Sequence, residues 1–152
     1  MPTRALVISI HPEYAKRIFE GSKTVELRRI TPRTPAGTLM IIYVTSPVQA
    51  VCGVCRVQSI VEGDPSTLWP RVREAAHISP QEYAAYYYGA TSACAIHIDD
   101  VLPFDPPIPL TELVRVSPGF KAPQSYRYVA PSGPTAGIWS TVTAVLSRSA
   151  PV

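Results

Sequence analysis

The chain has 152 residues, 46% of them hydrophobic, and a formal net charge of +3. This length and composition suit one folded domain and exclude a disordered chain, and no stretch approaches the ~18 apolar residues of a membrane span, so we expect no membrane partner. The N-terminus runs straight into a strand-like segment and lacks the features of a signal peptide, which predicts a cytoplasmic location.

In chain order, the first elements are a buried strand and a short helix. Residues 5–10 are apolar and β-branched on both faces, as in a strand inside a barrel or sandwich. Pro12 suits the first position of a helix, and Gly21 suits the position just after its end. His11 is interpreted as a helix-start residue rather than a catalytic base, because no carboxylate is adjacent in sequence to orient it.

The segment after this helix alternates in polarity, which predicts a strand whose side chains point to two faces. Val25 and Leu27 then point into the core. Glu26 and Arg28 share the opposite face, which Lys23 reaches from the preceding turn. A carboxylate, a guanidinium and an amine therefore gather there. The alternative is the ordinary solvated face of an amphipathic strand.

Two further strands and an interrupted helix are predicted next. Residues 39–45 form the most continuous apolar run and predict a central strand, and residues 51–60 predict its neighbour. Asp64 has the character of a helix N-cap, but Pro70 would interrupt a regular helix. We therefore expect a first turn and a second start near Trp69 or Pro70.

The three cysteines are an odd number, which argues against a disulfide framework. Cys52 and Cys55 have the spacing of a zinc-ligand pair, but neither a second pair nor a histidine cluster accompanies them. On a strand the two thiols face opposite sides unless Gly53 forms a bulge. Buried thiols are therefore favoured over a metal or redox site, and we expect no metal and no cofactor.

Ser79 begins the clearest helix, because Pro80 and Glu82 complete a capping box with it. The helix carries four tyrosines: Tyr83, Tyr86, Tyr87 and Tyr88. We expect these rings to pack the helix onto the sheet, with their hydroxyls at the rim. Stacking on nucleic-acid bases is the alternative.

Residues 92–102 predict another strand, with His97 and Asp99 on the same face. A solvent-facing pair is favoured there over a catalytic dyad, because residues two apart on a strand meet only in favourable rotamers. Residues 103–109 contain several prolines and predict a rigid connector, and residues 111–115 predict a brief helical turn.

The C-terminal segment is separated by residues 130–135, which have linker composition. Residues 138–146 are apolar and β-branched enough to form a last strand or a short helix. We divide the chain into a domain over residues 1–129, and a linker with a tail or an extra element over residues 130–152.

The pattern Gly-x-Lys-x-x-Glu-x-Arg from Gly21 to Arg28 resembles the signature of the ASCH domain family. A second similarity lies in residues 122–128, which look like the Pro-Gln-Ser-aromatic-Arg ending of many ASCH-like chains. The resemblance covers the order of elements from Ala5 to Val129. It implies an α+β fold, a PUA-like small mixed β-barrel with short helices covering its openings. The absence of a β-α-β-α rhythm also argues against a doubly wound sheet.

Members of this family are linked to RNA or to modified nucleosides, so the resemblance implies an RNA or nucleotide ligand in a basic cleft around the motif. The cations would hold phosphate, and Glu26 would accept a hydrogen bond from a base amine or a ribose hydroxyl. A tyrosine would stack on a base. The ligand-binding candidates lie in the motif, just after it, or in the second similar segment: Lys23, Glu26, Arg28, Arg29, Arg33, Gln124, Ser125 and Tyr126.

Some ASCH-like members resemble amidohydrolases that remove an acyl group from cytidine, and others are ribonucleases. In the amidohydrolases the motif lysine acts with a threonine at the Glu26 position and a glutamate near Ala76. Lys23 is retained here, but both partners differ, with Glu74 and His77 close by. If the protein is an enzyme, Lys23 and Glu26 are its catalytic candidates. The sequence alone does not decide between a binding module and an enzyme, and it does not predict the oligomeric state.

Overall fold

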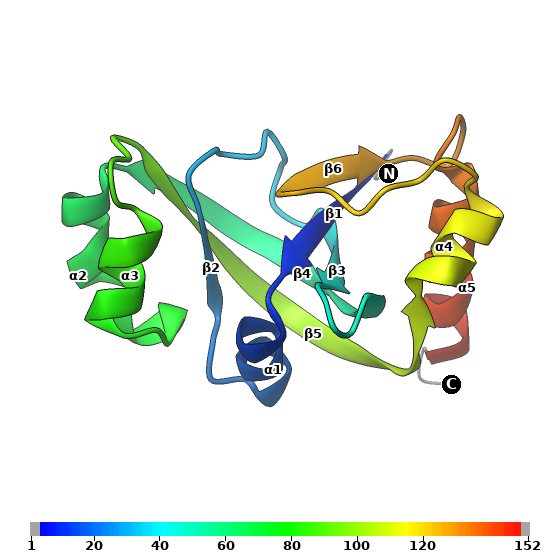
Figure 1. The fold of residues 1–152 in the computed structure, drawn as a ribbon, viewed down its shortest axis with the longest axis horizontal. Helices are drawn as coiled ribbons and strands as arrows, with labels where there is room; N and C mark the ends of the chain where they lie inside the picture. Colours follow the sequence, from blue (N-terminus) through cyan, green and yellow to red (C-terminus); the bar gives the residue numbers. More distant parts are fainter. Residues whose placement is uncertain (1–3, 150–152) are drawn as a thin grey trace.

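A curled six-stranded sheet organises residues 4–149, the part of the chain that this computed structural model describes (Figure 1). The strands are β1 (Ala5–Ile10), β2 (Val25–Arg28), β3 (Leu39–Val44), β4 (Ala50–Gly63), β5 (Ala93–Pro109) and β6 (Tyr126–Val129). Their order across the sheet is β2-β5-β4-β3-β1-β6. β1 and β3 are parallel, while the other neighbours are antiparallel. The sheet is therefore mixed, and its curl makes a half-barrel.

The helices are α1 (Pro12–Glu20), α2 (Pro65–Ala76), α3 (Pro80–Tyr86), α4 (Leu110–Val116) and α5 (Ala136–Ser149). In Figure 1, α2 and α3 lie at one end of the sheet, α4 and α5 lie at the other, and α1 lies below the strands. The predicted α+β class, with helices at the openings of a barrel-like sheet, is confirmed. None of the helices within residues 4–149 combines the length and apolar character of a membrane span.

Local signals in the sequence explain several element boundaries. α1 begins at Pro12 and ends where Gly21 takes the left-handed conformation, with φ 86°. α3 begins with the predicted capping box, in which the Ser79 hydroxyl accepts from the Glu82 amide and the Glu82 carboxylate accepts from the Ser79 amide. These predictions needed only neighbouring residues and are confirmed.

Tertiary packing overrides two other expectations. α2 continues through Pro70, because Leu68 and Val72 on either side of it are both buried against the sheet. Residues 103–109 are not a connector but the second half of β5, which pairs with β4 across register shifts that tolerate proline. For residues 138–146 the sequence left a strand or a short helix open, and they lie within a helix, with Ile138 and Val142 buried one turn apart.

Three apolar clusters hold these elements together. The first joins the sheet to α4 and α5 and includes Val7, Ile41, Leu113, Ile138 and Val142. The second joins the sheet to α1 and includes Ile8, Ile42, Ile18 and Ile96. The third joins β2 and β5 to α2 and α3 and includes Val25, Leu27, Leu68, Val72 and Ala95. Successive residues of β1 alternate between the first two clusters, so this strand is buried on both faces, as predicted.

Gly53 lies where α1 crosses the sheet. A Cβ atom built there would overlap the backbone oxygen of Leu102 on β5 and the ring of Phe19 on α1. Only a residue without a side chain therefore lets β5 and α1 approach this closely. The neighbouring Cys55 and the distant Cys94 are buried, and Cys52 is partly buried; all three are free thiols.

Candidate functional site

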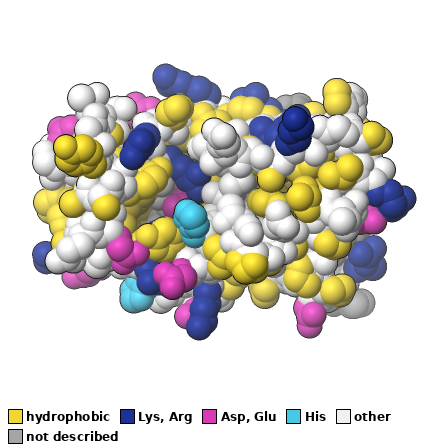
Figure 2. All heavy atoms as spheres, in the orientation of Figure 1, with side chains coloured by type: hydrophobic (Ala, Val, Ile, Leu, Met, Phe, Trp, Pro, Cys, Tyr) yellow, Lys and Arg dark blue, Asp and Glu magenta, His cyan; other side chains and the backbone are white. Residues whose placement is uncertain are grey.

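A cleft of about 930 Å³ opens between α1, β2, α3 and the segment that precedes β6. Figure 2 shows dark blue and magenta side chains together in the hollow between the α2–α3 end and the rest of the molecule. β2 supplies the floor through Glu26 and Arg28, and Lys23 enters from the turn after α1. The motif face of β2 is therefore the floor of a cleft and not an open, solvated surface.

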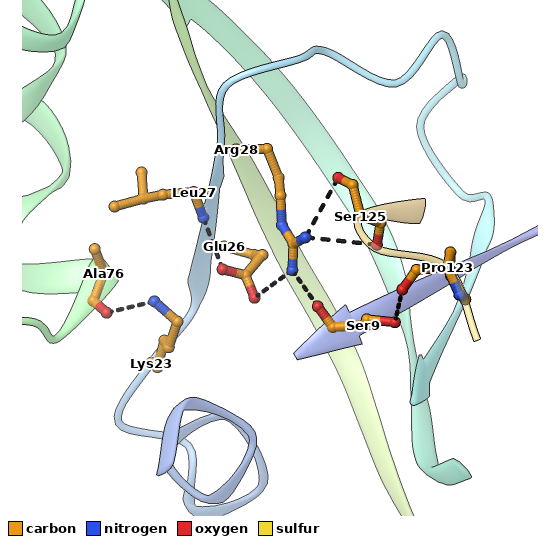
Figure 3. Close-up of polar contacts among 8 residues, drawn as sticks. All are labelled: Ser9, Lys23, Glu26, Leu27, Arg28, Ala76, Pro123 and Ser125. Atoms are coloured by element: carbon orange, nitrogen blue, oxygen red, sulfur yellow. Dashed lines mark hydrogen bonds and ion pairs between the residues drawn. The ribbon is translucent and has the colours of Figure 1, made fainter. Parts of the chain in front are cut away.

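Lys23 is almost fully buried, with an exposed fraction of 2%. Its Nζ atom donates a hydrogen bond of 2.8 Å to the carbonyl oxygen of Ala76, at the end of α2 (Figure 3). Burial lowers the pKa of this lysine, and the nearby Glu26 carboxylate opposes the shift. A lysine with a lowered pKa gives up its proton more readily than a free lysine does, as acid–base catalysis requires.

Glu26 is also buried, with an exposed fraction of 5%. Its Oε1 atom accepts a 3.0 Å hydrogen bond from the Leu27 amide. Its Oε2 atom lies 3.6 Å from a guanidinium nitrogen of Arg28 and has no hydrogen-bond partner among residues 4–149. Buried carboxylate oxygens are normally hydrogen-bonded, so this atom is a vacant acceptor facing the cleft.

Arg28 crosses the floor of the cleft and links three segments (Figure 3). One guanidinium nitrogen donates to the carbonyl oxygen of Ser9 at 2.6 Å, and the other lies 3.4 Å from the hydroxyl of Ser125. The Ser9 hydroxyl donates in turn to the Pro123 carbonyl at 2.5 Å. The Nε atom of Arg28 is buried without a hydrogen-bond partner in the described chain. The guanidinium is therefore fixed in place and keeps donor capacity for an anion.

The far wall of the cleft belongs to α3, which a side-chain bridge ties to α1. The Tyr14 hydroxyl donates to Glu82 Oε2 at 2.7 Å. Burial, together with this hydrogen bond, raises the pKa of Tyr14 to about 12, so its hydroxyl stays protonated as a donor. The Ser79 amide, and after it the Tyr14 hydroxyl, lowers the pKa of Glu82. The bridge thus joins a neutral phenol to a carboxylate.

The structure brings six of the eight predicted binding residues to the cleft: Lys23, Glu26, Arg28, Arg29, Gln124 and Ser125. The other two, Arg33 and Tyr126, are absent from its described lining. Arg33 is exposed, and its carbonyl oxygen accepts from the Tyr128 hydroxyl. Tyr126 packs against the second apolar cluster instead. The alternation of β6 could not reveal this, because the strand is short and partly buried on both faces.

Three lining residues whose side chains make hydrogen bonds escaped the sequence reasoning. Ser9 carried a signal, since it is the only polar residue in the otherwise apolar β1. Tyr14 lies one turn before Ile18, so its position predicts packing in the apolar stripe of the helix and not a place in a cleft. Glu82 already had a complete explanation as a capping residue. The contact between the last two joins residues 68 positions apart, which no local pattern shows.

Ala76 has no carboxylate with which to replace the glutamate of the amidohydrolase pattern, and it contributes its backbone carbonyl to Lys23. The nearby Glu74 and His77 line an adjoining cavity of about 490 Å³ with Arg17, and Ile78 and Glu82 line both cavities. The second carboxylate of the cleft is Glu82. No hydrogen bond joins His97 to Asp99 within residues 4–149, and this stretch holds no group of three His, Cys, Asp or Glu residues arranged for a metal.

The sequence and the fold of this chain are similar to those of known proteins. A family model described as the ASCH domain matches residues 8–107. A protein of Zymomonas mobilis described as an ASCH domain-containing ribonuclease is 40% identical over 123 residues, which are 81% of this chain and 82% of that protein. The crystal structure of ASCH from Zymomonas mobilis superposes with a TM-score of 0.81 at 35% identity, covering 95% of this chain and 94% of the other. A serine-to-alanine mutant of the Zymomonas protein gives a TM-score of 0.82, covering 93% and 98%.

Proposed function

Because the chain belongs to the ASCH domain family, we propose that its cleft binds RNA and cleaves it. The Zymomonas relative, which aligns over four-fifths of both chains, is described as a ribonuclease and supports this choice over a pure binding module. The cytoplasmic location expected from the sequence is compatible with an RNA substrate. The proposal concerns the cleft around Lys23, Glu26 and Arg28.

One observation carries the proposal. A buried carboxylate oxygen without a partner, Glu26 Oε2, lies at the floor of the cleft beside a guanidinium and near a buried lysine. Desolvation makes each of these groups a stronger electrostatic partner than it would be in water. Together they supply an acceptor for a hydroxyl proton, a donor for a leaving oxygen and a cation for a phosphate.

The chemistry that suits this set is internal phosphoryl transfer within RNA. The ribose 2′-oxygen attacks the adjacent phosphorus as Glu26 Oε2 takes the 2′-hydroxyl proton. The bond from phosphorus to the 5′-oxygen breaks, and the Lys23 ammonium gives that oxygen its proton. The Arg28 guanidinium stabilises the added negative charge on the phosphoryl oxygens. The products are a 2′,3′-cyclic phosphate and a 5′-hydroxyl end.

The test compares Lys23→Met and Glu26→Gln with the parent protein on labelled single-stranded RNA. Each change should slow cleavage at least about 100-fold, the usual contribution of an acid–base group. The double variant should be no slower than the slower single variant, because residues that act as a unit are not additive. Analysis of the ends should show a cyclic phosphate on one fragment.

The matched controls are Lys16→Met and Glu20→Gln, which remove the exposed ion pair on the outer face of α1. They should leave cleavage unchanged. Thermal unfolding of all variants separates lost chemistry from lost folding, since Lys23 is buried. If Lys23→Met and Glu26→Gln both cleave RNA at the parental rate, the proposed function of this cleft is wrong. Products that end in 3′-hydroxyl and 5′-phosphate would refute the internal attack alone.

A further inference from the structure

The four tyrosines near the end of α3 have different environments. Tyr83 and Tyr87 are buried, and their hydroxyls donate to the backbone oxygens of Pro65 and Arg28. Tyr88 is 88% exposed but is not part of the described cleft lining. Tyr86 is 39% exposed and lines the cleft. Of the four rings, only that of Tyr86 is both at the cleft and open to solvent.

The Tyr86 ring is packed against two neighbours at this position. Its ring packs against that of Tyr87 with centroids 4.8 Å apart and an interplanar angle of 70°. The guanidinium of Arg29 lies over the Tyr86 ring, 5.2 Å from its centroid, while its Nε atom donates to the Tyr86 carbonyl oxygen at 3.0 Å. The next residue, Ile30, is 68% exposed and lines the same opening. We call Arg29, Ile30 and Tyr86 the mouth shelf.

We propose that the mouth shelf stacks the base of the nucleotide that adjoins the one held in the cleft. The ligand is then unpaired RNA of at least two nucleotides. This inference rests on the proposed function, and it defines the substrate class of the same site. Aromatic rings and arginine guanidinium planes are the groups on which splayed-out RNA bases stack, and the shelf presents one of each.

Two features distinguish the shelf from an ordinary exposed tyrosine, which needs no explanation on its own. The first is continuity, since all three of its residues also line the cleft that holds Lys23 and Glu26. The second is preorganisation, because Arg29 and Tyr86 are tied to each other before any ligand arrives. A base that stacks there loses little free energy to ordering the protein. A paired base inside a duplex has no free face to offer.

The experiment measures binding of the full chain by fluorescence anisotropy. The probe is a labelled single-stranded 2′-fluoro RNA pentamer, which lacks the attacking hydroxyl and is not cleaved. Tyr86→Ala should weaken its binding about 5- to 150-fold, the range for loss of one stacked base. Tyr86→Phe should bind like the parent. Tyr88→Ala is the matched control, since it removes an equally large and more exposed ring two residues away.

Two further probes complete the test. A nucleoside monophosphate, which fills only the part of the cleft around Lys23 and Glu26, should bind Tyr86→Ala and the parent equally. A longer duplex that contains the pentamer sequence and stays paired in the assay should bind the parent more weakly than the single strand does. Tyr86→Leu keeps an apolar side chain without a π-face, and it should lose pentamer affinity even if the alanine variant folds poorly.

The remaining outcomes distinguish a failure of the shelf from a failure of the cleft. If the parent binds the pentamer and both Tyr86→Ala and Tyr86→Leu bind it equally well, the shelf is wrong while the proposed function stands. If the monophosphate is weakened as strongly as the pentamer, Tyr86 contacts the nucleotide in the cleft and the flanking position is refuted. If the parent binds no RNA at all, the proposed function fails first, and the shelf fails with it.

Discussion

Two opposing influences act on the pKa of Lys23. Burial disfavours the charged form of the lysine, whereas the carboxylate beside it favours that form. Arg17 and Arg28 add smaller effects that lower the pKa of Lys23. The protonation of this lysine therefore depends on the charge of Glu26, and the two residues cannot be understood separately.

This dependence makes a prediction with a definite sign. In the parent protein the pKa of Lys23 should lie below 10.5, the value of a free lysine. Glu26→Gln should lower it further, because the substitution removes the one nearby group that most strongly supports the ammonium form. The measurement is an NMR titration of the lysine side-chain carbons, with Lys16 on the outer face of α1 as an internal reference. An upward shift in the Glu26→Gln variant would contradict this account.

At the scale of single elements, β2 serves two different surroundings with alternate residues. Leu27 faces the third apolar cluster, where α2 packs, and Glu26 faces the cleft. The predicted alternation of this strand is confirmed for the apolar side. On the polar side the prediction of a shared face is confirmed too, but that face is enclosed by α3 and by the segment before β6.

Leu27→Ala should therefore lower the free energy of unfolding by about 2–5 kcal/mol, the usual cost of truncating a buried leucine. Chemical denaturation measures this directly. Val114→Ala on the exposed side of α4 is the control, and its cost should be small. Should Leu27→Ala unfold at the parental midpoint, β2 does not pack against α2 through this side chain.

The boundaries that the sequence predicted well belong to elements with their own local signals. The capping box at Ser79 and the left-handed Gly21 needed no distant partner. Pro70 and the prolines of β5 misled the prediction because packing of flanking apolar residues and irregular strand pairing accommodate them. Local propensity lost to tertiary contacts at both places.

The same division applies to the candidate site. Lys23, Glu26 and Arg28 come together through strand alternation and one turn, so the sequence could place them on one face. Alternation alone was also compatible with a solvated face, and the resemblance to the family signature singled them out. Ser125 and Glu82 reach the cleft from positions 97 and 56 residues away from Arg28 and Glu26 respectively. Contacts of that range depend on how the sheet curls, which hydrophobic patterning does not specify.

At the scale of the whole molecule, different apolar clusters stabilise the cleft and the C-terminal helices. The second and third clusters hold the elements around the cleft, and the first holds α4 and α5. The first cluster, which includes Ile138, lies with α4 and α5 at the end of the sheet away from α2 and α3 (Figure 1). The division of the chain after Val129 stays a prediction. The burial of Ile138 and Val142 nevertheless indicates that α5 contributes to stability.

Ile138→Ala should destabilise the protein by about 2–5 kcal/mol. Below its melting temperature it should keep the parental KM for RNA cleavage, because its cluster contains none of the residues that line the cleft. Thermal unfolding and steady-state cleavage on the same preparation provide both readouts. A raised KM in the folded variant would show that the two ends of the sheet are coupled.

The missing side chain at Gly53 also has a consequence for how the family can vary. Phe19 occupies the space that any Cβ at position 53 would need, and the backbone of Leu102 closes it from the other side. Because the Leu102 backbone oxygen is the nearest atom and cannot retreat, a smaller residue at 19 would relieve only part of the overlap. Position 53 should therefore stay glycine across relatives, although it does not belong to the described cleft lining. The position of α1, and of the Tyr14 that it brings to the cleft, thus depends in part on a residue outside the cleft lining.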